Sequence, residues 1–309
     1  MAKRFDVPIL FLIFNRPETT KRVFKAIREV RPSRLFIAAD GPRKDRMGEK
    51  EKCEETREIT EKIDWPCKVE RLYRESNLGC RKAVSEAISW FFENVEEGII
   101  LEDDCLPDPS FFNYCEALLK RYRGNSQVMH ISGNNFQNGV HRGEKMASYY
   151  FSKYPHIWGW ATWRRAWKKY SFGIDLNSKR FKEIEHEMNF WERIYWRSVF
   201  MSVKLGILDT WDYQWVYTCW VNRGLAIVPN SNLVLNIGFD KSATHSASMP
   251  NYLVSVRLES IDKIIHPSAV AVDVDADRYT WIKLFGGNYK NFLKSLLLIP
   301  YLYFKRIFV

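Results

Sequence analysis

Three consecutive carboxylates, Glu102, Asp103 and Asp104, follow directly after the apolar run Ile99-Ile100-Leu101. Adjacent carboxylates repel each other, so three of them at the end of a buried strand favour a bound cation. Oxygen ligands without His or Cys suit Mg²⁺ or Mn²⁺, which leave coordination positions open for phosphate oxygens. An acidic surface turn is the alternative, but the position straight after a buried strand favours a metal site.

Asp212 is a second residue that could do chemistry, because it stands among Trp211, Tyr213 and Trp215. Apolar neighbours raise the basicity of a carboxylate, so Asp212 suits a general base. The alternative is a helix-capping role, since a helical pattern runs from here to Trp220.

A polar segment at 236–250 carries a third group of candidates. Lys241, Thr244, His245 and Ser246 can all donate hydrogen bonds to phosphate oxygens. A lone His is more often structural, but the Gly- and Ser-rich neighbourhood favours a binding role for His245.

Alternating strands and helices must position these residues. A continuous apolar run predicts a strand at 7–14, and short strand patterns follow at 35–39, 69–73, 99–101 and 128–132, with helical patterns between them. This spacing predicts right-handed βαβ units and a mostly parallel, Rossmann-like α/β sheet flanked by helices. Arg16, Asp40, residues 74–77 and the acidic triplet all follow strand ends, and open α/β sheets bind ligands at that edge.

Several element boundaries are predicted by local signals. Asn15 before Pro17 predicts a helix capped by Asn15, and the charged segment 43–61 predicts an exposed helix. Asn77 either caps the next helix or lets the backbone approach a bound ligand. Beyond residue 145, aromatic-rich patterns predict helices at 158–170, 181–204 and 211–220. Two short strands are predicted at 225–228 and 233–235.

Composition limits the class of protein. The chain has 309 residues, 46% hydrophobic and 15% aromatic, which excludes a disordered chain. No G-x-G-x-x-G follows the first strand and no G-x-x-x-x-G-K-[ST] occurs, which disfavours a dinucleotide oxidoreductase and a P-loop NTPase. The net charge of +10 is spread out, without a Lys/Arg block, so we expect no nucleic-acid partner.

The six cysteines form no C-x-x-C pair, which indicates free thiols and a cytoplasmic protein. Without an internal linker, we expect one domain over 1–250 and a C-terminal extension over 251–309. The tail at 291–309 is apolar with Lys294, Lys305 and Arg306, and Pro300 interrupts it. This pattern predicts a helix lying on an anionic membrane surface, peripheral to the inner face, rather than a membrane span. A helix packed on the domain itself is the alternative.

The stretch from Ile99 to Asp104, followed by residues 107–112, resembles the metal-binding stretch of GT-A fold glycosyltransferases. The ordered motifs over roughly 7–250 are similar to those of the inverting N-acetylglucosaminyltransferase that initiates complex N-glycans, and of related bacterial transferases. This resemblance implies a GT-A fold with an aromatic-rich helical acceptor half. It also implies a metal-dependent inverting transfer from a nucleotide-diphosphate sugar, UDP-linked, to a hydroxyl of a glycan or lipid-linked acceptor.

The resemblance further implies a role for each matching residue. Asp104 is the implied metal ligand, with Asp103 at the ribose and Glu102 at the transferred sugar. Arg16 is implied to contact the nucleotide and Asp40 to read the uracil edge.

The implied base is Asp212, and Trp211 beside it is implied to contact the nucleotide sugar. Residues 236–246 resemble the loop that closes over the donor diphosphate. Tyr213 and Gln214 stand where the eukaryotic pattern has Asp and Trp. This departure bears on how the acceptor is bound more than on the base.

Two other functions stay open at this point. A sugar-phosphate nucleotidyltransferase uses a related sheet and Mg²⁺, but it needs a Gly-rich basic loop where this chain has Asn15-Arg16-Pro17. A non-catalytic carbohydrate-binding or membrane-binding protein is the third possibility.

Overall fold

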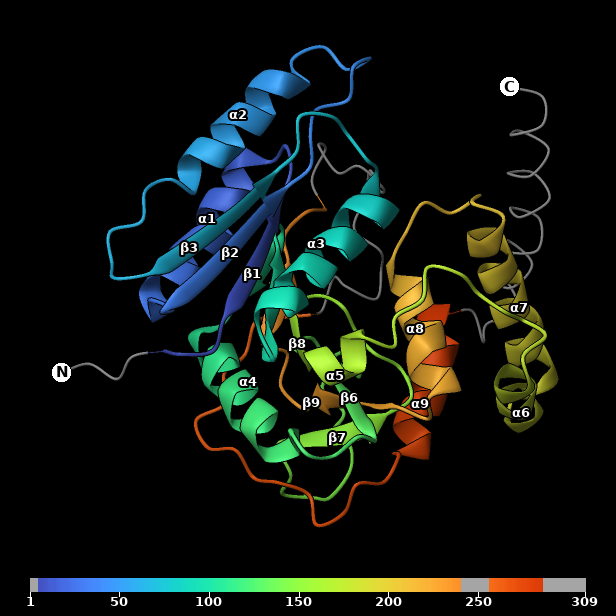
Figure 1. Cartoon of the computed structure of the whole chain (residues 1–309). Helices are drawn as coiled ribbons and strands as arrows, with labels where there is room; N and C mark the ends of the chain where they lie inside the picture. The colour runs from blue at the N-terminus through green and yellow to red at the C-terminus, as the bar shows by residue number, and fades with distance from the viewer. Residues whose placement is uncertain (1–4, 240–255, 286–309) are drawn as a thin grey trace.

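The computed structural model describes residues 5–239 and 256–285, which build a mixed α/β sheet covered by helices on both faces (Figure 1). The eight strands lie in the order β3-β2-β1-β4-β8-β6-β9-β7. Their bounds are β3 Lys68–Tyr73, β2 Arg34–Ala39, β1 Ile9–Ile13, β4 Glu97–Glu102, β8 Trp160–Trp163, β6 Val128–Ser132, β9 Leu225–Pro229 and β7 Tyr149–Ser152. All run in one direction except β8 and β7, so the mostly parallel sheet predicted from sequence is confirmed. A small second sheet pairs β5 (Cys105–Pro107) with β10 (Val234–Asn236).

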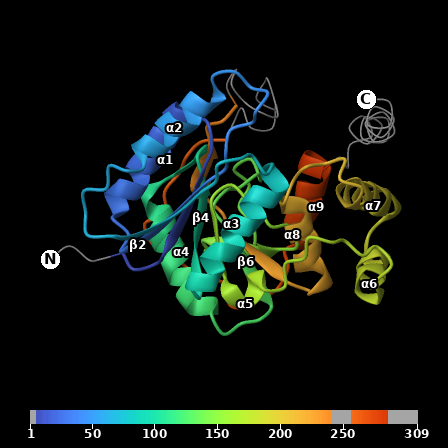
Figure 2. The ribbon, with the colours of Figure 1, turned by 45° about the horizontal axis from the view of Figure 1, so that its top comes forward.

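The central strand β1 is apolar and buried throughout because helices cover both faces of the sheet. Along β1, Phe11 packs into one core with α1 (Pro17–Val30) and α4 (Pro109–Tyr122). Leu10 and Leu12 face the opposite core, with α3 (Cys80–Asn94), α5 (Arg164–Trp167) and α8 (Asp212–Val221). Figure 2 shows α1 and α2 (Glu49–Ile59) on one side of the sheet and α3 on the other.

A third core lies beyond α8, away from the sheet. It joins α6 (Lys179–Glu187), α7 (Phe190–Lys204) and α8, and Trp281 from a π-helical turn at Trp281–Phe285 packs into it. The turn continues α9 (Val274–Thr280). Residues 256–285 therefore pack on the same body, since Phe151 in β7 also pairs with Val272. No helix of the described ranges is both long and apolar enough to cross a bilayer.

The structure corrects the predicted helix at 158–170. Residues 160–163 instead form β8, which pairs antiparallel with β4 on one side and β6 on the other. Trp160 faces the core under α3, whereas Ala161 and Trp163 face the core under α4, which is the two-residue alternation of a strand. Only α5 within the predicted range is helical. Hydrogen bonding to the backbones of β4 and β6 thus makes these residues a strand, although sequence periodicity alone predicts a helix.

The predicted start of α1 is also corrected. Arg16 is the N-cap residue, without a side-chain cap, and the Asn15 amide donates instead to Glu49 Oε1 at 2.8 Å. The predicted helix at 43–61 is shorter, beginning at Glu49, and Cys53 within it is buried. The short strands β5 and β7 and the helix α9 have no clear signal in the sequence pattern. The short strands at 225–228 and 233–235 are present as β9 and, shifted by one residue, β10.

Candidate active site

A cavity of about 360 Å³ opens at the carboxyl ends of β1, β2 and β4 and at the first turns of α3. It lies where the first strand connections diverge to opposite faces of the sheet, the usual ligand site of such folds. The residues lining it include most of the sequence candidates, namely Arg16, Asp40, Asn77, Glu102, Asp103 and Asp104. Arg43, Arg74, Gly79, Cys80 and Asp209 also line it.

The acidic triplet lies where β4 ends and the turn to β5 begins. Glu102 is the last residue of β4, and Asp103 Oδ2 accepts a hydrogen bond from the Phe14 amide at 3.1 Å. Asp104 Oδ2 accepts one from Arg16 Nη1 at 2.6 Å, and the same nitrogen is 4.0 Å from Asp103 Oδ1. Parallel pairing of β1 with β4 therefore brings Arg16 and the triplet together across 88 residues of sequence.

The electrostatics of the triplet follow from burial and mutual repulsion. Burial, followed by the charge of Asp104, raises the pKa of Asp103 to about 7, although Arg16 opposes the shift. Burial, Asp104 and Asp103 likewise raise the pKa of Glu102 well above its usual range, and Asp212 adds to the effect. Burial would lower the pKa of Arg16, but the charges of Asp103 and Asp104 raise it overall. Without a bound cation, burial and mutual repulsion thus favour the protonated form of Glu102 and Asp103.

The donor set fits a divalent cation only as part of a larger complex. In the described ranges, no three His, Cys, Asp or Glu side chains are arranged to enclose a metal ion. Asp104 offers oxygen atoms at the cavity wall, and Mg²⁺ or Mn²⁺ commonly takes one or two carboxylates together with substrate phosphates and water. A cation here would therefore take Asp104 from the protein and its remaining ligands from a diphosphate and water.

Asp40 and Asn77 tie two loops of the cavity wall together. Asp40 accepts hydrogen bonds from the backbone amides of Gly41, Leu78 and Gly79 at 3.0 to 3.2 Å. The Asn77 amide donates to the Gly41 carbonyl at 2.9 Å, so Asn77 does not cap α3, whose N-cap residue is Gly79. A Cβ on Gly41 would lie 2.4 Å from the Ser76 backbone, which explains the glycine at this close approach. Both side chains thus shape the wall through backbone contacts.

Arg43 and Asp209 are cavity residues that the sequence candidates did not include, and Arg74 was expected only as part of the segment 74–77 at this edge. Arg43 Nε donates to Glu49 Oε2 at 3.0 Å, and Arg74 Nη2 lies 3.4 Å from Glu86 Oε2. Arg74 follows a strand, which was a usable signal, whereas Arg43 sits in a segment interpreted as a solvated helix. Asp209 accepts a hydrogen bond from the Arg81 amide at 3.2 Å and so joins the start of α3 to the loop before α8.

Asp212 is the first residue of α8, and the Thr210 hydroxyl donates to its Oδ1. Its charge is close enough to raise the pKa of Glu102, although Asp209, not Asp212, is among the residues that line the described cavity. Trp211 is only 2% exposed and stacks on Trp160 with ring centroids 5.6 Å apart. The Trp211 ring therefore lies in the core and anchors the loop, rather than facing the cavity.

The loop after β10 reaches the acidic triplet. The Ile237 amide donates to the Asp104 carbonyl at 2.8 Å, and a Cβ on Gly238 would lie 2.4 Å from Asp104 Oδ2. Phe239 contacts Trp158 with ring centroids 5.7 Å apart. Lys241, Thr244 and His245, the candidates for binding phosphate, lie outside the described residues, as does the tail at 291–309.

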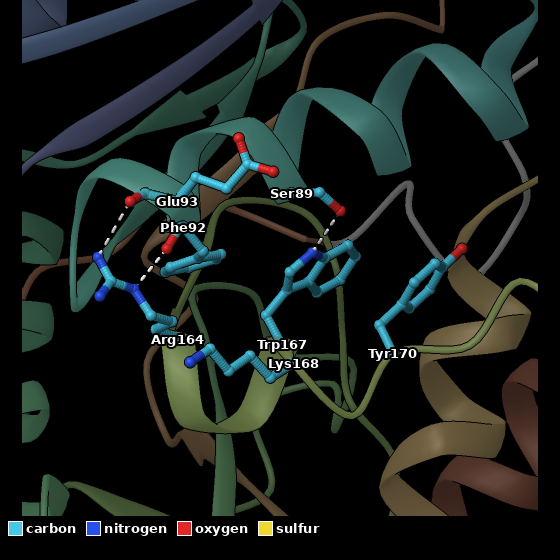
Figure 3. A pocket seen from close by; sticks show the side chains of 7 residues that line it. All are labelled: Ser89, Phe92, Glu93, Arg164, Trp167, Lys168 and Tyr170. Carbon is cyan, nitrogen blue, oxygen red and sulfur yellow. Dashed lines mark hydrogen bonds between the residues drawn. The ribbon is translucent and has the colours of Figure 1, made fainter.

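A second hollow of about 430 Å³ lies between α3 and α5 (Figure 3). Two of its side chains bond across it to α3: Arg164 Nε donates to the Phe92 carbonyl at 2.5 Å and Trp167 Nε1 to Ser89 Oγ at 3.1 Å. Trp167 stacks on Tyr170 with centroids 4.3 Å apart, which covers one face of the indole. These contacts join α3 to α5, and the chemistry-bearing side chains gather in the first cavity.

Comparisons with known proteins give structural neighbours only. No family model matches the chain, and no curated protein matches its sequence. Among solved structures, S. aureus TarS 1-349 aligns with a TM-score of 0.42 at 8% identity, over 74% of this chain and 59% of TarS. HddC from Yersinia pseudotuberculosis aligns with a TM-score of 0.35 at 11% identity, over 56% of this chain and 86% of HddC. A UDP-glucose pyrophosphorylase complexed with UDP-glucose aligns with a TM-score of 0.34 at 13% identity, over 56% of this chain and 82% of the pyrophosphorylase.

Proposed function

We propose that this protein is a metal-dependent inverting glycosyltransferase. Its donor is a nucleotide-diphosphate sugar linked to UDP, and its acceptor is a hydroxyl group of a glycan or of a lipid-linked molecule. The observation that carries the proposal is the cavity itself. Three carboxylates meet Arg16, Arg43 and Arg74 at the carboxyl edge of a mostly parallel sheet. Such a pairing of charges suits a ligand that carries phosphates together with a cation and polar hydroxyl groups.

The donor side of the reaction falls to residues of the first four strands. Asp104 would hold the cation, which when bound acts as a Lewis acid on the leaving diphosphate. Asp103 and Glu102 would accept hydrogen bonds from the ribose and from the transferred sugar. Arg43 and Arg74 lie at the wall near Asp40 and would bind the anionic or carbonyl oxygens of the nucleotide.

The acceptor side falls to the loop before α8. Asp212 would accept the proton of the acceptor hydroxyl while that oxygen attacks the anomeric carbon. The bond from the anomeric carbon to the diphosphate breaks on the opposite face, so one displacement inverts the configuration. Burial of Trp211 against Trp160 fixes the backbone that carries Asp212, which favours a well-defined position for the base.

The test combines a substrate screen with one conservative variant. A panel of nucleotide sugars, with and without Mn²⁺, is scored by thermal shift and by release of nucleoside diphosphate, alone and with acceptor glycans. Asp212→Asn keeps the shape but removes the proton acceptor, so turnover should fall by about 10² or more with donor affinity unchanged. Asp64→Asn, at an exposed ion pair with Arg28, is the matched control and should keep full turnover.

Two outcomes would reject the proposal. Formation of pyrophosphate from a nucleoside triphosphate and a sugar phosphate, without sugar transfer, would identify a nucleotidyltransferase. Binding of saccharide without consumption of any nucleotide sugar would identify a non-catalytic protein. Near-normal turnover in Asp212→Asn would remove Asp212 as the base and direct attention to Asp209, which lines the cavity.

A further inference from the structure

The ion pair between Arg16 and Asp104 occupies the carboxylate to which the proposed function assigns a cation. Arg16 Nη1 lies 2.6 Å from Asp104 Oδ2, and the two side chains are 16% and 15% exposed. The other Asp104 oxygen, Oδ1, accepts a hydrogen bond from the Cys105 thiol at 3.5 Å. A divalent cation that binds Asp104 therefore meets a resident guanidinium.

The chain closes over this pair from a second direction. A Cβ on Gly238 would lie 2.4 Å from Asp104 Oδ2 and 2.7 Å from Arg16 Nη1, so backbone lies directly against both side chains. Gly238 is held in turn by the Asn236 side chain, which accepts a hydrogen bond from its amide at 2.8 Å. The pair is thus packed between β1, the β4–β5 turn and the segment after β10.

Removing the close partner from a shielded ion pair weakens the compensation of the remaining charge, which is costly. Displacement of Arg16 from Asp104 by a cation alone would exchange the 2.6 Å contact with Asp104 Oδ2 for the weaker attraction of Asp103, whose Oδ1 lies 4.0 Å from Nη1. A diphosphate in the same cavity offers Arg16 a new anionic partner, because Arg16 and Asp104 both line it. The exchange is then favourable only when cation and diphosphate arrive together.

We propose that Arg16 is a built-in counter-ion of Asp104, which competes with the divalent cation until a donor diphosphate takes over the guanidinium. This inference rests on the proposed function for the identity of the cation and the diphosphate. By linkage, the cation and the nucleotide must raise each other's affinity by the same factor, and Arg16 sets that factor.

Electron paramagnetic resonance of free Mn²⁺ tests this with the whole chain, in the absence and presence of UDP. In the unsubstituted protein, saturating UDP should tighten Mn²⁺ binding at least tenfold. Arg16→Gln should bind Mn²⁺ alone at least tenfold more tightly than the unsubstituted protein, and UDP should then add little. Arg16→Lys keeps the charge and should stay close to the unsubstituted protein. Arg28→Gln, which breaks the exposed pair with Asp64, is the matched control and should change nothing.

The outcomes separate this inference from the proposed function. Arg16→Gln that is folded by circular dichroism, yet binds Mn²⁺ no more tightly, overturns the counter-ion role while UDP-dependent Mn²⁺ binding still supports the donor site. Mn²⁺ binding that survives Asp104→Asn places the cation elsewhere and overturns the inference. A protein that binds neither Mn²⁺ nor UDP overturns both the inference and the proposed function.

Discussion

Replacement of the buried His130 by Asn should remove a large part of the acid sensitivity of this fold. His130 lies on β6 and is fully buried, with its ring stacked on Trp160 at a centroid distance of 4.9 Å. The Trp215 indole can only donate, and it donates to His130 Nδ1 at 3.1 Å. The Nε2–H must therefore donate to the His156 carbonyl at 2.9 Å, which fixes the neutral tautomer.

The magnitude follows from the shift in pKa. Burial lowers the pKa of His130 to about 3 in the native state, against about 6.5 for the unfolded chain. The unfolded state therefore takes up the proton first, and the stability present above pH 6.5 is lost as the pH falls toward 3. Over the full window the loss amounts to about 5 kcal/mol, and between pH 7 and pH 5 it is about 2 kcal/mol.

Urea unfolding at pH 7 and pH 5 measures this loss as a change in the free energy of unfolding. His130→Asn loses ring packing and should be less stable at pH 7, but its loss between pH 7 and pH 5 should be smaller by about 2 kcal/mol. His156, whose pKa burial lowers to about 4, contributes equally to both proteins. His141→Asn, at an exposed position, is the control and should retain the full pH dependence.

The result also bears on the site, because Trp215 follows Asp212 by one turn of α8. A proton on Nδ1 would break the bond to Trp215 and loosen the helix that carries the proposed base. Equal pH dependence in the original protein and His130→Asn would refute this reasoning. So would a native-state imidazole resonance of His130 that titrates near pH 6.5.

Three further predictions concern other parts of the chain. Asp104→Ala should abolish Mn²⁺-dependent donor binding in calorimetry while circular dichroism stays unchanged; unaltered donor affinity in Mn²⁺ would remove Asp104 as the ligand. Gly98→Ala should destabilise the fold by about 1–3 kcal/mol in urea unfolding, because its Cβ would meet a buried phenylalanine ring at 2.3 Å, whereas Gly124→Ala, with open space around it, should not. Charge reversal at Lys305 and Arg306 in the full chain should reduce flotation with anionic liposomes at moderate salt; equal flotation would argue against a membrane role of the tail.

Much of the sheet could be predicted because its signals are local. Apolar runs of three to eight residues, separated by helical patterns, indicate strands buried on both faces with helices on either side. Parallel connection then places the residues after each strand at one edge, whatever the details of packing. For this reason Arg16, Asp40, Asn77 and the acidic triplet could be assigned to one crevice, and the structure brings them to one cavity.

Other features depended on partners that are distant in sequence. Trp160 to Trp163 form a strand because β4 and β6 present backbone donors and acceptors on both sides, a fact that no local periodicity encodes. Trp211 likewise lies in the core because Trp160 and Trp167 surround its ring.

The sequence by itself determined the fold class and the edge of the sheet where the chemistry-bearing residues gather. Only the tertiary structure decided how their charges are paired: Arg16 with Asp104, Arg43 with Glu49, and Asp40 with the amides of residues 41, 78 and 79. The physical reason is the range of the forces. Apolar periodicity reports burial one element at a time, whereas an ion pair or a hydrogen bond exists only once two loops are held within about 3 Å of each other.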